Sequence, residues 1–111
     1  MSVIAEVVVI TAESEPAGFK ALNDELVAID SERSQQFLPI DMTAAGGTKA
    51  FCADVWAGAF NHLSPSQIED AICAAPWEHP ERVVVVINPY DYREDPKTAT
   101  VTELRKQLVG S

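Results

Sequence analysis

The sequence has few cysteines, and it lacks long apolar segments. Its 111 residues include two cysteines, Cys52 and Cys73, which are too few for a disulfide framework. No apolar run approaches the roughly 18 residues that a membrane-spanning helix requires. The first residues lack a basic segment and carry Glu6 inside an apolar run, which is atypical of a signal peptide. We therefore expect no contact with a membrane and a reduced, cytoplasmic chain.

Basic residues are also scarce. The chain has 8 Lys and Arg against 17 Asp and Glu, and its formal net charge is −9. Binding to nucleic-acid phosphates requires clustered Lys and Arg, so we expect no direct contact with nucleic acid. Solubility alone could account for the acidic balance. The alternative is a protein partner with a basic surface, which the acidic chain would attract over a distance.

Motifs for catalysis and for cofactor binding are missing. There is no G-x-S-x-G, H-E-x-x-H or EF-hand pattern, and the glycines before Lys49 lack the spacing of a P-loop. Cys52, His62, Cys73 and His79 are separated by nine, ten and five residues, without the close ligand pairs of zinc sites. Only Lys49 is basic near Cys52, so an activated thiolate is not expected. We predict no catalytic, cofactor-binding or metal-binding residues, which favours a protein that is not an enzyme.

What is present is the composition of one folded domain. Hydrophobic residues make up 47% of the chain and charged residues 23%, which is ordinary for a globular protein. The length fits a single domain that spans residues 1–111. Val3–Ile10 is almost continuously apolar and predicts a central strand that is covered on both faces.

A helix is predicted next by apolar residues at three- and four-residue steps. These are Phe19, Leu22, Leu26 and Ile29. Pro16 suits its first turn. The outer face of this helix is acidic and includes Asp24 and Glu25.

A hairpin is predicted around Gly46 and Gly47. In its first strand Leu38, Ile40 and Met42 share the more apolar face, and Pro39 places the strand at an edge of the sheet. The return strand is expected over residues 49–60.

Two further helices and a strand follow. Ser64, Pro65 and Gln67 predict the start of a helix with a capping box, and Thr100 with Glu103 predicts a second box at the start of a short C-terminal helix. Between these helices, Val83–Ile87 reads as a strand.

The order of elements predicts an α+β fold. Strand, helix, strand, strand, helix and strand match a ferredoxin-like β-α-β-β-α-β arrangement with a four-stranded, mostly antiparallel sheet and an added C-terminal helix. In that fold the last strand lies at an edge, yet Val83–Ile87 is apolar throughout. Either the C-terminal helix covers this strand, or its free edge pairs with another subunit in a homodimer.

Aromatic and charged residues flank the last strand. Trp77 precedes it, and Tyr90 and Tyr92 follow it within an acidic loop. Tyrosine and tryptophan are frequent at the energetic centres of protein interfaces. The candidate partner-binding residues are Tyr90, Asp91, Tyr92, Glu94, Asp95 and Trp77, with Asp24 and Glu25 on the first helix. The alternative is that Trp77 and the tyrosines only complete the core and its rim.

These features lead to three hypotheses on function. The first is a small acidic protein-binding domain that inhibits or neutralises a macromolecular partner with a basic surface, as immunity proteins and phage-encoded inhibitors do. The second is a dimeric ferredoxin-like protein with a small-molecule or enzymatic pocket, motivated by His62 and Trp56 near strand ends. The third is a structural subunit of a larger assembly, with Val83–Ile87 as its pairing edge.

Overall fold

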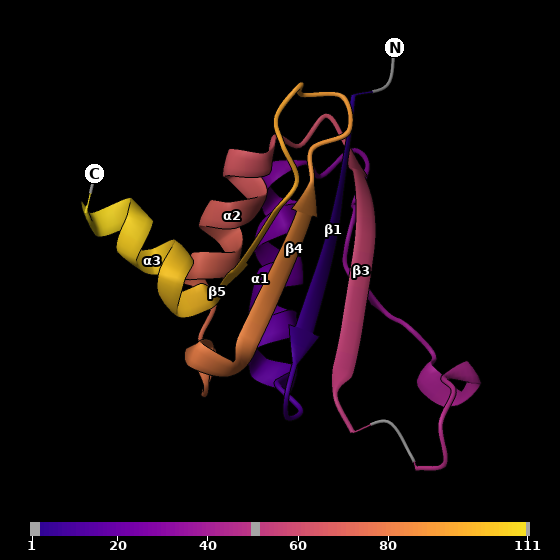
Figure 1. Cartoon of the computed structure of the whole chain (residues 1–111). Helices are drawn as coiled ribbons and strands as arrows, with labels where there is room; N and C mark the ends of the chain where they lie inside the picture. The colour runs from indigo at the N-terminus through magenta and orange to yellow at the C-terminus, as the bar shows by residue number, and fades with distance from the viewer. Residues whose placement is uncertain (1–2, 50–51, 111) are drawn as a thin grey trace.

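A five-stranded sheet forms one layer of the molecule, and helices cover one face of it (Figure 1). A computed structural model describes residues 3–49 and 52–110. The strands are β1 (Ile4–Thr11), β2 (Leu38–Pro39), β3 (Asp54–Asn61), β4 (Val83–Asn88) and β5 (Lys97–Thr100). The helices are α1 (Pro16–Ile29), α2 (Pro65–Ala74) and α3 (Val101–Gly110), with the short 3-10 turns η1 (Met42–Ala44) and η2 (Pro80–Arg82). Among the described residues, no helix is long and apolar enough to cross a membrane.

The strand order is β2-β3-β1-β4-β5, and every neighbouring pair is antiparallel. The expectation of one compact α+β domain is confirmed. The expectation of four strands is wrong, because Lys97–Thr100 forms a fifth strand beside β4. The final helix begins at Val101, directly after this strand.

The position of β5 makes β4 an inner strand of the sheet. β4 lies between β1 and β5, so both of its edges are paired within the chain. We expected that the C-terminal helix would cover this strand or that its free edge would pair with another subunit. The chain itself provides the pairing, and β4 keeps no edge for a homodimer through this strand.

The hydrophobic core lies between the sheet and its helices. Phe19, Leu22 and Leu26 are fully buried as the predicted stripe requires, whereas Ile29 at the end of α1 is 38% exposed. Phe19 stacks on Trp56 of β3 with ring centroids 4.2 Å apart. The space between sheet and helices is thus occupied by packed side chains at this position.

Both predicted capping boxes are present. At the start of α2, the Ser64 N–H donates to the Gln67 side chain at 2.9 Å, and the Gln67 N–H donates to the Ser64 hydroxyl at 3.2 Å. Thr100 and Glu103 form the same reciprocal pair at 2.9 and 3.1 Å. Each box satisfies two amides that the first turn of a helix leaves without partners.

In the first strand of the hairpin, the face of Leu38 and Ile40 that was described as more apolar is the exposed one. Phe37 is buried, whereas Leu38 and Ile40 are 64% and 47% exposed. The cause is a side-chain clamp from α1: Asn23 accepts the Phe37 N–H at 2.7 Å and donates to the Phe37 carbonyl at 3.1 Å. β2 is an edge strand, as Pro39 predicted. Of the expected return strand, residues 50 and 51 lie outside the described residues, and β3 begins at Asp54.

Candidate protein-binding surface

The loop of residues 89–96 joins β4 to β5 at one end of the sheet (Figure 1). Tyr90 is 71% exposed, and no other large hydrophobic side chain among the described residues has a larger exposed fraction. Tyr92 is half-buried and packs against the core. Of the two tyrosines predicted to bind a partner, Tyr90 therefore exposes its ring to solvent, whereas Tyr92 packs the loop against the core.

Hydrogen bonds anchor this loop to the start of β1. The Asp91 carboxylate accepts the Ile4 N–H at 2.7 Å, and the Asp91 N–H donates to the Ile4 carbonyl at 3.1 Å. Within the loop, the Tyr92 N–H donates to the Pro89 carbonyl at 2.9 Å. The exposed Tyr90 thus stands on a loop whose backbone is fixed on both sides of it.

The rest of the loop is acidic and exposed. Glu94 and Asp95 follow Arg93, which has a φ of 55° in the left-handed region. With Asp91, the loop carries three carboxylates against the one guanidinium of Arg93. A basic surface is the electrostatic complement of such a loop.

The other predicted acidic residues lie elsewhere. Asp24 and Glu25 are on α1, in the layer of helices, and not in the loop at the end of the sheet. Asp24 also forms an exposed ion pair with Lys20 at 2.8 Å, and its hydrogen bond raises the pKa of Lys20. The two acidic groups therefore belong to different elements of the fold.

Trp77 lies in the core. Its side chain is 6% exposed, and its indole N–H donates to the Ile72 carbonyl at 2.7 Å. Its ring packs edge-on against Phe19, with centroids 5.1 Å apart. This corresponds to the alternative stated for Trp77, in which the indole completes the core and has little surface left for a partner.

The cysteine and histidine residues do not gather into a ligand set. Among residues 3–49 and 52–110 there is no group of three or more Cys, His, Asp and Glu side chains that could hold a metal ion. Burial raises the pKa of the Cys73 thiol above its ordinary value. That direction is opposite to the one a nucleophilic thiolate needs.

A surface that the sequence interpretation missed is the face of the sheet opposite the helices, which we call the open face. Side chains alternate across a strand, so every second residue of β1, β3 and β4 points to it. Its apolar residues are Ile4, Val8, Ile10, Val55, Ala57, Ala59, Val84 and Val86, flanked by Leu38 and Ile40. Val8, Val84 and Val86 are partly exposed, whereas Val7 and Val85, their neighbours on the other face, are 1% exposed.

The signal for the open face was present in the sequence. Continuous apolar runs in β1 and β4 predicted strands covered on both faces. Within the described residues, helices cover only one of those faces.

In comparisons with known proteins, no family model, no curated protein and no solved structure matches this chain significantly. The function is therefore inferred from the residues themselves.

Proposed function

We propose that this chain is a small acidic protein-binding domain that inhibits or neutralises a macromolecular partner, and that residues 89–96 contact the partner. The observation that carries the proposal is the 71% exposure of Tyr90 on a loop anchored to β1. An exposed aromatic residue on a loop with a fixed backbone binds with little loss of backbone freedom.

The charge of the loop supports a basic partner surface. Asp91, Glu94 and Asp95 lie in the same loop as Tyr90, and the chain as a whole carries a net charge of −9. Charges at the rim of an interface mainly accelerate association, while a buried aromatic anchor slows dissociation. Occupying a functional surface of the partner is sufficient for inhibition, so the proposal requires no catalytic residue in this chain.

The experiment that tests the electrostatic part compares two charge-removal variants. Glu94→Gln with Asp95→Asn removes loop charge, and Asp24→Asn with Glu25→Gln removes equal charge from α1. With the partner captured from the source cells, we expect the loop variant to associate more slowly and to lose most of the salt dependence of association. The α1 variant should behave nearly as the wild type, and equal behaviour of the two variants would contradict the assignment to the loop.

We propose in addition that β1 to β4, with α1 and α2, form a ferredoxin-like core to which β5 is added. The all-antiparallel order β2-β3-β1-β4 and the positions of the two helices in the chain support this proposal. We also propose a reducing, cytoplasmic location, because two cysteines in 111 residues do not provide a disulfide framework.

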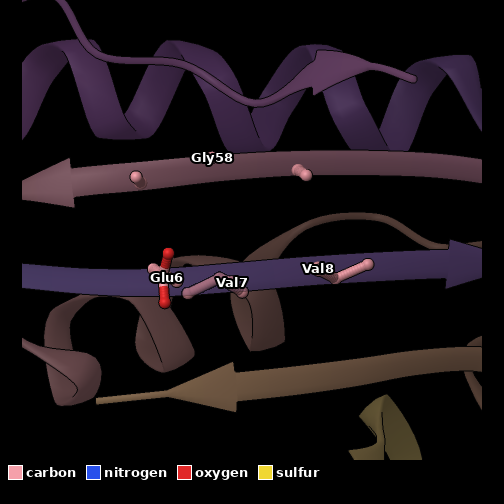
Figure 2. A pocket seen from close by; sticks show the side chains of 6 residues that line it. Glu6, Val7, Val8 and Gly58 are labelled. Atoms are coloured by element: carbon pink, nitrogen blue, oxygen red, sulfur yellow. The ribbon is translucent and has the colours of Figure 1, made fainter. Parts of the chain in front are cut away.

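The second candidate function is a dimeric protein with a small-molecule pocket, and one observation favours it. Glu6, Val8, Ala57 and Ala59 line a hollow of about 290 Å³ over β1 and β3 (Figure 2). The hollow forms where Ala57 and Ala59 have small side chains. A thermal-shift screen of small molecules would support this candidate only if Ala57→Leu, which fills the hollow, abolished the response.

A further inference from the structure

We propose that the open face of the sheet binds a second copy of this chain, sheet against sheet, in a two-fold symmetric dimer. This surface is distinct from the loop of residues 89–96, so the proposal stands apart from the function proposed above. The first observation that supports a dimer is the composition of the face. An antiparallel sheet with one face in water normally alternates apolar and polar residues. Here the second face is apolar too, at Val8, Ile10, Val84 and Val86.

The charge of the open face indicates what kind of surface would cover it. Among its positions on β1, β3 and β4, Glu6 alone is charged, and it accepts a hydrogen bond from the Asn88 side chain at 2.8 Å near one end of the face. A basic protein or a nucleic acid would find almost no complementary charge there. A second open face is also apolar and almost uncharged, so it matches.

The size of the open face is adequate for a reversible dimer. Strands of eight residues are about 26 Å long, and five strands are about 24 Å wide, although β2 and β5 are short. The projected area is therefore about 500 Å², and the accessible area is larger because side chains stand above the sheet. Specific interfaces bury at least about 600 Å² on each partner, so the expected dimer lies at the low end of stable association.

The relief of the open face also suits a second sheet. The hollow over Ala57 and Ala59 on β3 is also lined by Val8 on β1, whose larger side chain forms a ridge beside these alanines. Two sheets pack face to face by interdigitating large and small side chains at a separation of about 10 Å. In a two-fold arrangement each copy supplies both the ridge and the hollow.

The edges of the sheet are poorer candidates for self-association. β2 is only two residues long and contains Pro39, which cannot donate a ladder hydrogen bond. The other edge strand, β5, begins with Lys97. Short strands, prolines and lysines at the edges oppose pairing between sheets. The open face is therefore the surface that favours a second copy.

Sedimentation velocity of the purified full chain, from micromolar to millimolar concentration, tests the proposal. We expect the wild-type mass to rise from monomer to dimer. The double variant Val84→Thr, Val86→Thr keeps β-branched side chains but makes the face polar, and it should raise the dimer dissociation constant at least about tenfold. Ile29→Ala, an exposed apolar position on α1 and outside the face, should dimerise as the wild type does. A wild type that stays monomeric, or a folded double variant that dimerises equally well, would overturn the proposal.

A second measurement needs no variant and so does not depend on the folding of one. On dilution of the wild type, methyl resonances of Val8, Val84 and Val86 should shift, while those of Val7 and Val85 on the helix-covered face should not. Shifts confined to other surfaces would also overturn the proposal.

Discussion

The buried carboxylate of Glu15 accepts a hydrogen bond from the backbone N–H of His79 at 3.0 Å, and its other oxygen accepts the N–H of Glu78 at 2.8 Å. Glu15 is 4% exposed and precedes α1, so this contact ties the start of α1 to the segment before β4. The same carboxylate makes no capping bond to α1 itself. Two distant segments are thereby held together by one side chain.

Replacement of Glu15 by alanine should be strongly destabilising. Both amides would lose a charged acceptor at a site with little access to water, and we expect the free energy of unfolding to fall by about 3 kcal/mol. Urea unfolding measures the loss as a lower midpoint with an unchanged slope. Glu13→Ala is the control, because Glu13 makes only exposed contacts, with Arg82 and with the His79 side chain, and should cost less than about 1 kcal/mol. Equal costs for the two variants would contradict the role given to Glu15.

Gly18→Ala should destabilise the protein even though alanine is the better helix former. A Cβ at Gly18 would lie 2.3 Å from Cε3 of Trp77, which is too close for unchanged packing. Overpacking should cost about 2 kcal/mol, more than the roughly 1 kcal/mol that helix propensity returns. Thermal unfolding should show a lower Tm for Gly18→Ala and little change for Gly46→Ala, where no atom lies within 4 Å. A higher Tm for Gly18→Ala would contradict this prediction, because it would show that the Trp77 ring leaves room for a Cβ at Gly18.

The capping box of α3 should contribute a pH-dependent part of the stability. The hydrogen bond from the Thr100 N–H lowers the pKa of Glu103 below its ordinary value of 4.5. A carboxyl whose folded pKa is lowered stabilises the fold above its unfolded pKa, and this contribution is lost as the pH falls through the folded pKa. Glu103→Gln should therefore reduce stability at neutral pH, and the difference from the wild type should shrink in acid. A difference that is constant across the titration would contradict this assignment.

Local signals predicted much of the fold. The two capping boxes, the stripe of Phe19, Leu22 and Leu26, and the edge position of Pro39 depend on nearby residues alone, and the structure contains them. The burial of Phe37 beside the exposed Leu38 could not be predicted locally, because it depends on Asn23 in α1. β5 was missed because four residues, Lys97–Thr100, provide too little periodicity to distinguish a strand from the start of a helix.

The candidate site was predictable only in part. The exposure of Tyr90 followed from its place among charged residues after a strand. Whether Trp77 was exposed could not be read from its neighbours, because its burial depends on the space left by Gly18 and on Phe19 in α1. The open face could be recognised only from the arrangement of the elements in space. An apolar strand indicates that both of its faces are covered, but it does not indicate which element or partner covers them.

The central claim is that Tyr90 anchors a protein partner. It is tested most directly by comparing the amount of partner captured from an extract of the source cells by immobilised wild type, Tyr90→Ala and Ile29→Ala. Ile29 is an exposed apolar residue of α1, outside the loop, and serves as the matched control. We predict that Tyr90→Ala weakens binding at least about tenfold, as expected when an anchoring aromatic is removed, and that Ile29→Ala binds as the wild type does. Equal capture by wild type and folded Tyr90→Ala would contradict the claim.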